Sequence, residues 1–151
     1  MTSSISGKVG APFSSTYTAS KHALHGYFES LRNESFSSGV RITMVCPGPV
    51  VSEIIERAYT GSLDSKWRGS HRDESKRMAT SRCAFLVAVA MANRLDEVWI
   101  AKQPFLLYFY AQQYLPSVTR NLFPRIMTKE RIMRLRDGED QLATPDAGAK
   151  A

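Results

Sequence analysis

The sequence is poor in several features that would place it in a common class of protein. Its 151 residues include two cysteines, Cys46 and Cys83, which form no CxxC pair and predict no disulfide framework. The three histidines show no metal-ligand spacing with these cysteines, so no metal site is expected. Every apolar run is shorter than the about 20 residues that a spanning helix needs. Residues 1–7 also lack the charged and then apolar pattern of a signal peptide.

Charge of one sign is in moderate excess, with a formal net charge of +6. A nucleic-acid-binding protein would place basic residues among stacking aromatic residues on a recognisable module, and no such pattern occurs, so nucleic acid is not an expected partner. Two interpretations of the basic C-terminal segment stay open, a membrane-surface contact and a solvated helix face. The residues that carry most of the excess are Arg120, Arg125, Lys129, Arg131, Arg134 and Arg136.

Hydrophobic residues make up 43% of the chain, enough for a folded core, and their periodicity predicts alternating helices and strands. Such an alternation predicts parallel pairing in an α/β sheet. The predicted elements are a loop over 1–16, a helix over 17–36 ended by Gly39, a strand over 40–45 ended in a loop at Pro47, a core helix over 84–92 capped by Thr80 or Ser81, and a strand over 97–101.

The remaining segments depart from this rhythm. Residues 51–76 are polar and irregular, with a short helix expected near 52–59, and a long connection of this kind is typical of a lid. The aromatic run 105–110 is expected to pack over a substrate pocket or to lie on a bilayer surface. Amphipathic helices broken at Pro116 and Pro124 are predicted to follow it.

A tyrosine and a lysine four residues apart, Tyr17 and Lys21, begin the long predicted helix. Side chains at this spacing project from nearly the same helix face. A free phenol has a pKa of about 10, and an ammonium held close to it favours the phenolate and lowers that pKa. The pair therefore predicts a general acid/base that exchanges a proton with an alcohol or carbonyl oxygen.

The surroundings of this pair strengthen the prediction. A Ser-Ile-Ser-Gly segment starts at Ser4, Pro12-Phe13 precedes the tyrosine, and a Pro-Gly-Pro-Val-Val-Ser segment over 47–52 follows the next strand. In order and spacing, these residues resemble the short-chain dehydrogenase/reductase family. The resemblance implies an α/β fold of the Rossmann-like, doubly wound type, of which this chain would be the C-terminal half. It also implies a dimer face on the helix over 17–36.

The family resemblance also implies roles for individual residues. Ser4 matches the serine that hydrogen-bonds the substrate oxygen, Tyr17 matches the general acid/base, and Lys21 matches the lysine that assists it and holds the nicotinamide ribose. The cofactor-binding positions that the resemblance implies are therefore Tyr17 and Lys21 together with Pro47, Gly48, Val50 and Ser52, where serine replaces the usual threonine but keeps the hydroxyl.

The family's glycine-rich pyrophosphate turn, its Asn-Asn-Ala-Gly segment and its catalytic asparagine do not occur in this sequence. We therefore expect a truncated enzyme that binds NADP(H) or NAD(H) weakly. The expected domains are the half-fold over 1–101, a hydrophobic and basic extension over 102–136 and a disordered tail over 137–151.

Several later segments are similar to endoplasmic-reticulum carbonyl reductases of the same family, which act on retinoid, steroid and xenobiotic carbonyls with NADPH. That similarity implies a hydrophobic substrate and an endoplasmic-reticulum membrane location. The alternative is an inactive fragment that acts only through association with an intact subunit.

Overall fold

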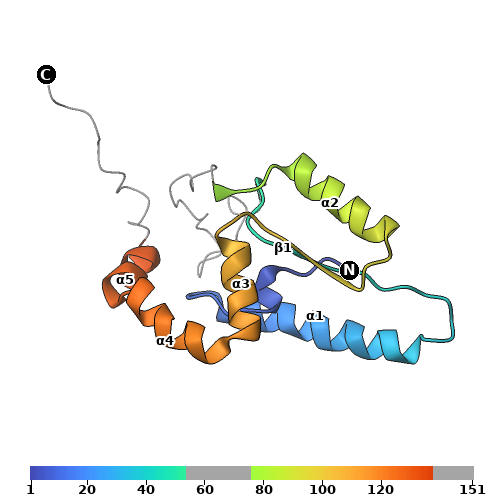
Figure 1. The fold of residues 1–151 in the computed structure, drawn as a ribbon, viewed down its shortest axis with the longest axis horizontal. Coiled ribbons are helices and arrows are strands. Elements are labelled where there is room, and N and C mark those ends of the chain that lie inside the picture. The colour runs from blue at the N-terminus through green and yellow to red at the C-terminus, as the bar shows by residue number, and fades with distance from the viewer. Residues whose placement is uncertain (54–75, 138–151) are drawn as a thin grey trace, which may run out of the picture.

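The computed structural model describes residues 1–53 and 76–137. The predicted lid and the predicted tail therefore lie almost wholly outside the described residues. Figure 1 shows the described chain as a small α/β arrangement with a run of helices extending to one end. The elements, in chain order, are the 3-10 helix η1 (Ile5–Gly7), α1 (Ser15–Glu34), β1 (Met44–Pro47), α2 (Thr80–Ala92), β2 (Glu97–Ile100), α3 (Phe105–Tyr114), α4 (Pro116–Ile126) and α5 (Lys129–Asp137).

The two strands pair in parallel, as the alternation of helices and strands predicts. β1 begins later than the predicted strand over 40–45, because β2 begins at Glu97, the partner of Met44. Pro47 is the last residue of β1, whereas the sequence placed it in the loop after the strand. The amide of Met44 donates to the carbonyl of Asp96 at 2.9 Å, and the amide of Gly48 donates to the carbonyl of Ile100 at 2.8 Å. Pro47 lies between these two bonds, so the amide hydrogen that proline lacks is not required for pairing with β2. The register is Met44–Glu97, Val45–Val98, Cys46–Trp99 and Pro47–Ile100.

The first residues of the chain lie on the other side of β1, where a loop was predicted. Thr2 forms a parallel bridge with Val45. The amide of Ser3 donates to the carbonyl of Val45 at 2.8 Å, and the amide of Val45 donates to the carbonyl of Met1 at 2.9 Å. The predicted loop over 1–16 is thus wrong at both ends, since these residues extend the sheet and α1 begins at Ser15. The consequence is that the candidate site starts at the carboxyl end of a strand-like segment.

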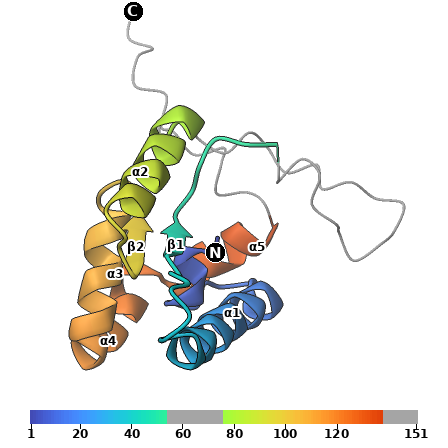
Figure 2. The same cartoon turned by 90° about the vertical axis from the view of Figure 1, so that its right-hand side faces the viewer.

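Helices cover both faces of this small sheet, and Figure 2 shows α1 and α2 on opposite sides of the strands. Side chains alternate across a strand, so each face has its own apolar cluster. One cluster contains Ile5, Val9, Cys46 and Phe109, with Trp99 and Tyr108 packed against it. The other contains Val45, Met78, Cys83 and Ile100, with Val50, Leu86, Val87 and Val98 packed against it.

The helix α1 forms because its sequence has no proline and no run of β-branched residues. It ends at Glu34, two residues before the predicted end, and Gly39, with a φ of +75°, lies in the turn that follows rather than at the helix end. His25 is its only buried residue. Arg32, in the last turn, donates to the carbonyls of Ile42 and Asp96 at 3.0 and 2.9 Å. These bonds hold the end of α1 against the start of the sheet.

The helix α2 differs from the expected core helix over 84–92. Cys83 and Ala90 are buried, but Phe85 is 57% exposed and Met91 is 63% exposed. Only one face of the helix packs on the sheet. Thr80 does not cap it: its hydroxyl donates to the carbonyl of Val51 at 2.5 Å, and the N-cap position is Ala79.

Helices α3 and α4 pack against each other, with Tyr108 of α3 beside Phe123 of α4 at 6.4 Å between ring centroids. Pro116 begins α4, as predicted for a break, but Pro124 does not interrupt the helix at once. The helix continues to Ile126 and ends within a turn of that proline. Among the residues described, no helix has both the length and the apolar character required to cross a bilayer.

Candidate active site

The serine predicted to bind the substrate oxygen, Ser4, lies at the N-terminus of η1 and is 8% exposed. Its hydroxyl oxygen accepts a hydrogen bond from the amide of Ser6 at 3.1 Å, and its hydroxyl also lies 3.5 Å from the carbonyl oxygen of Pro47. The hydroxyl of the preceding residue, Ser3, donates to the carbonyl of Lys21 at 3.4 Å. The Ser3–Ser4 segment therefore joins the lysine turn of α1 to the carboxyl end of β1.

The predicted acid/base pair lies in the first two turns of α1. The Lys21 ammonium lies 5.6 Å from the centre of the Tyr17 ring, so the two side chains share a helix face as their spacing predicts. Tyr17 is 46% exposed. The Ser20 hydroxyl donates to the carbonyl of Tyr17 at 2.7 Å. The phenol is therefore accessible on this part of the chain while its ammonium partner is held close.

The predicted nicotinamide loop follows β1 directly. A Cβ atom built on Gly48 would lie 2.8 Å from the Cβ atom of Ala101 and 3.4 Å from Cδ1 of Ile5, so this close approach requires glycine. Val50 forms a parallel bridge with Met78. Ser52 is exposed at the end of the first described range. The loop is thus held next to η1 at its start and against Met78 at its end.

An exposed aromatic residue precedes Tyr17. Phe13 is 60% exposed and adopts a φ of +58°, which is uncommon for a residue other than glycine. A turn in which the amide of Ser14 donates to the carbonyl of Ala11 at 3.3 Å holds it there. The sequence pattern marked Pro12-Phe13 as part of the family resemblance but gave no reason for this backbone conformation.

Five side chains that no sequence spacing connects meet between η1, α1, β1 and β2. Nε2 of His25 lies 3.6 Å from Sγ of Cys46, and Nδ1 of His25 lies 3.6 Å from a carboxylate oxygen of Glu97. The Lys8 ammonium lies 2.8 Å from the same carboxylate, and the Trp99 indole N–H donates to its other oxygen. We call these five residues the polar clamp, since they join η1, α1, β1 and β2.

The members of the polar clamp are held in their neutral forms where they are buried. Burial, reinforced by the charge of Lys8, lowers the pKa of His25 below its usual value. Burial raises the pKa of Cys46 to about 12, with Glu97 adding to the effect. His25, Cys46 and Glu97 together offer three ligand atoms within 4.8 Å of one another, as a metal site would. However, Lys8 and Trp99 already occupy both oxygens of Glu97, so the group fits a structural clamp better than a metal site.

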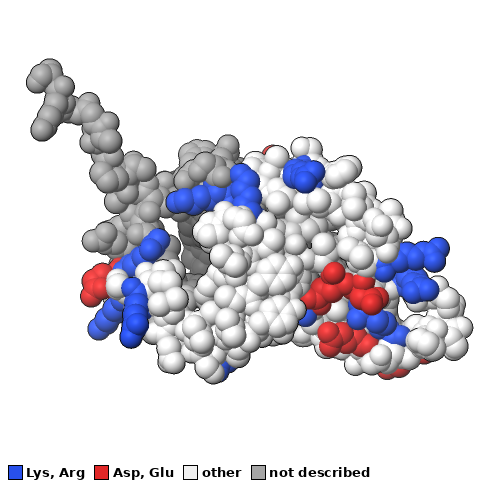
Figure 3. All heavy atoms as spheres, in the orientation of Figure 1, with Lys and Arg blue, Asp and Glu red and all other residues white. Residues whose placement is uncertain are grey.

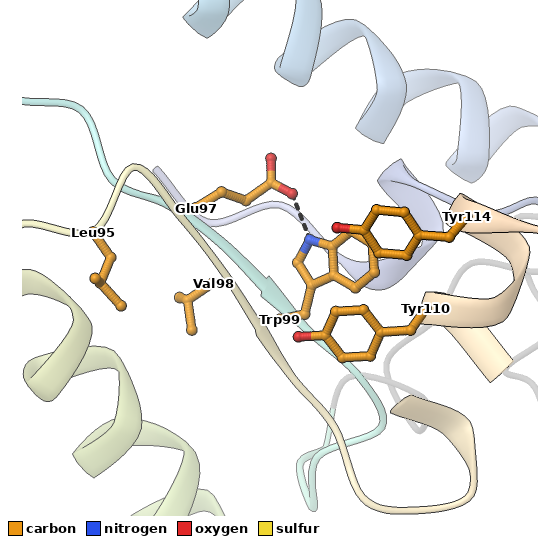
Figure 4. Close-up of a pocket in the computed structure, with 6 residues that line it drawn as sticks. All are labelled: Leu95, Glu97, Val98, Trp99, Tyr110 and Tyr114. Atoms are coloured by element: carbon orange, nitrogen blue, oxygen red, sulfur yellow. Dashed lines mark hydrogen bonds between the residues drawn. The ribbon is translucent and has the colours of Figure 1, made fainter. Parts of the chain in front are cut away.

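A shallow groove of about 370 Å³ lies on the far edge of β2, and Figure 4 shows its lining. The Tyr110 ring stacks on Trp99 at 5.0 Å between centroids, and the Tyr114 ring lies parallel to that of Tyr110 at 6.4 Å. None of the residues predicted for catalysis lines this groove. The aromatic run over 105–110 thus contributes both to the core, through Phe109, and to this exposed stack.

Comparison with known proteins relates the chain to a family. A family profile described as short chain dehydrogenase matches residues 1–61, which include Ser4, Tyr17, Lys21 and the loop after β1. The chain is a relative of the short-chain dehydrogenase/reductase family, a family of oxidoreductases, and the resemblance stated from the sequence is confirmed.

Individual relatives extend the match beyond the site. The chain is 44% identical over 138 residues to human (Homo sapiens) dehydrogenase/reductase SDR family member 7, covering 91% of this chain and 40% of that protein. The Mus musculus protein of the same name is 41% identical over the same shares. A Dictyostelium discoideum protein described as SDR family protein 7-like is 36% identical over 96 residues, covering 64% of this chain and 28% of that protein. The chain thus spans about 40% of the length of the mammalian relatives it matches.

Proposed function

We propose that this chain carries the proton-transfer half of an NAD(P)(H)-dependent oxidoreductase that acts on carbonyl or hydroxyl groups of hydrophobic substrates. The observation that carries the proposal is the Tyr17–Lys21 pair on α1, next to the segment that holds Ser4 against the end of β1. Three chemically suited side chains thus come from segments that the fold ties together. Their spacing in the family-matched region supports the same roles.

In the proposed reduction, Tyr17 gives a proton to the substrate oxygen, and in oxidation it takes that proton back. The Lys21 ammonium stabilises the phenolate that remains. The Ser4 hydroxyl donates to the same substrate oxygen and fixes its position, which is worth more in an enclosed site than in water. The nicotinamide nucleotide, when bound, supplies or accepts the hydride.

The residues present fit one end of such a nucleotide. Lys21, with its three donors, would hold the ribose hydroxyls, and the loop from Pro47 to Ser52 would lie beside the carboxamide. The close contact of Gly48 with Ala101 and Ile5 keeps that loop in place. The sequence has no glycine-rich turn for the pyrophosphate, so we propose that the 151 residues alone bind NADP(H) or NAD(H) weakly and turn over little substrate.

The proposed substrate is hydrophobic. Phe13 is exposed in a left-handed conformation four residues before Tyr17, where it offers an apolar surface beside the acid/base. The similarity to endoplasmic-reticulum carbonyl reductases supports retinoid, steroid or xenobiotic carbonyls and the same cellular location. Because relatives are longer than this chain, these assignments concern the complete enzyme.

A chimera tests the proposal. This chain would replace the matching C-terminal segment of the human relative, and carbonyl reduction would be followed by NADPH absorbance. We expect activity that Tyr17→Phe reduces by about 10²-fold or more. Tyr27→Phe is the matched control, since Tyr27 lies on the same helix and is 64% exposed. Equal activity of the two variants would refute the role of Tyr17.

The isolated chain tests the accompanying proposal of weak binding. Calorimetric titration with NADPH should show little or no heat of binding. Measurable reduction by the purified chain, lost in Tyr17→Phe, would show instead that the 151 residues suffice for catalysis.

A second candidate function is association with an intact subunit without catalysis. Exposed aromatic residues support this function: Tyr27 on α1 is 64% exposed, and Phe36, just after α1, is 93% exposed. His25 is the one buried residue of α1. Sedimentation of the chain with the full-length human relative would test this. Binding that Tyr27→Glu weakens would support it, and independent sedimentation would reject it.

A further inference from the structure

An exposed surface of α4, beside the face that packs on α3, is apolar. Leu115, just before the helix, and Val118, Leu122 and Ile126 are spaced three and four residues apart, which places them on one helix face. They are 56%, 57%, 44% and 55% exposed. We call this row the α4 stripe.

The surface of α4 next to this row already has its packing partner. Thr119 is 6% exposed, and its hydroxyl donates to the carbonyls of Leu115 and Pro116 at 3.1 Å. Phe123 packs against Tyr108 of α3. The α4 stripe is therefore not needed to attach the helix to the rest of the chain. A row of large apolar side chains in water indicates a surface that binds something.

The charge around the stripe indicates the chemistry of that partner. Residues 116–137 contain six basic residues and two acidic ones, so this segment carries four of the six positive charges in excess. Arg120, Arg125 and Lys129 are exposed. Figure 3 shows Lys and Arg gathered around α5, beside the uncharged surface of α4. A second copy of this chain would bring the same positive charge to the contact and repel it.

We propose that the α4 stripe docks on an anionic lipid bilayer, with Arg120, Arg125 and Lys129 at the level of the headgroups. An apolar row bordered by arginine and lysine is the composition of a helix that lies in the membrane interface. Each basic residue near an anionic surface strengthens binding by about fivefold. The proposal involves surface residues of α4 and α5 alone, so it stands or falls separately from the proposed catalysis.

Sedimentation of the full chain with lipid vesicles tests the proposal. We expect binding to phosphatidylcholine vesicles that contain about 30% phosphatidylserine, and at least tenfold weaker binding to phosphatidylcholine alone, because several basic residues contribute. Val118→Asp should weaken binding by about tenfold or more, since it removes an apolar contact and adds a negative charge. Phe85→Asp on α2 is the matched control, because Phe85 is likewise 57% exposed, and it should bind as the unmodified chain does.

Two further variants separate charge from folding. Arg125→Glu should weaken binding to the anionic vesicles, whereas Arg41→Glu, an exposed arginine in the loop before β1, should change it by a smaller factor. When vesicles are added, the tryptophan emission of Val118→Trp should shift to the blue relative to that of the unmodified chain. The emission of Phe85→Trp should show no such shift. Circular dichroism of each variant confirms that it folds.

Three outcomes would overturn the proposal. The first is a chain that stays in the supernatant with anionic vesicles. The second is an equal weakening of binding by Val118→Asp and Phe85→Asp. The third is self-association that Val118→Asp abolishes without any vesicle binding, which would make a second copy the occupant of the stripe.

Discussion

A methyl group added at Gly7 tests the packing that holds the candidate site together. The Cβ atom of an alanine there would lie 2.7 Å from Cδ2 and Nε2 of His25 and 2.7 Å from the Ser3 hydroxyl oxygen. The His25 ring has little room to retreat, since the Cys46 sulfur lies 3.6 Å from Nε2 and Glu97 lies beyond Nδ1. Gly7→Ala should therefore lower the free energy of unfolding by about 1–3 kcal/mol, the usual cost of overpacking.

Gly26, in the middle of α1, is the matched control. A Cβ atom there meets no heavy atom within 4 Å. Gly26→Ala should raise the free energy of unfolding by about 0.5–1 kcal/mol, because alanine has the better helix propensity. Urea unfolding followed by circular dichroism measures both variants. The two substitutions are expected to change the free energy of unfolding in opposite directions. A Gly7→Ala variant as stable as the unmodified chain would refute the packing argument, whatever the effect of Gly26→Ala on stability.

The remaining predictions concern the polar clamp. Because burial lowers the pKa of His25 in the folded chain, stability should be full above the unfolded value of about 6.5 and should fall as the pH drops below it. His25→Gln should remove this part of the pH dependence in urea unfolding. The charge of Lys8 lowers the pKa of His25 and that of Glu97 raises it, so Lys8→Met should raise this pKa and Glu97→Gln should lower it further, as measured by NMR titration. With a pKa of about 12 and no exposed surface, Cys46 should react with a thiol reagent at neutral pH only when the chain unfolds.

Each of these predictions has a contrary result. Stability that rises on acidification would contradict the neutral, buried state of His25. Movement of its pKa in the same direction in Lys8→Met and Glu97→Gln would contradict the opposed charges. Rapid labelling of Cys46 under native conditions would show that the thiol is accessible, and Cys83 allows comparison because it is also buried, at 9% exposed.

The sequence by itself determined the family and the helical spacing that brings Tyr17 and Lys21 together. The relation of Tyr17 to Lys21 follows from helical spacing, a local property of the chain, and the structure places the two side chains together as expected. Parallel pairing of the two strands also followed from the order of the elements. The predicted roles of all the site residues stay predictions, because contacts within the chain do not test catalysis, substrate binding or nucleotide binding. These residues are Ser4, Tyr17, Lys21, Pro47, Gly48, Val50 and Ser52.

Only the tertiary structure decided which distant residues meet. Periodicity within 40–47 could not fix the limits of β1, which depend on where β2 begins beside it. The polar clamp joins residues 8, 25, 46, 97 and 99, and no local pattern relates them. Likewise, the apolar sequence of α2 predicted a core helix. Burial depends on the neighbours that the fold places around a helix, and here the neighbours cover only one face of α2. The spacing of residues determines local geometry, whereas burial and long-range contacts arise only when the elements pack.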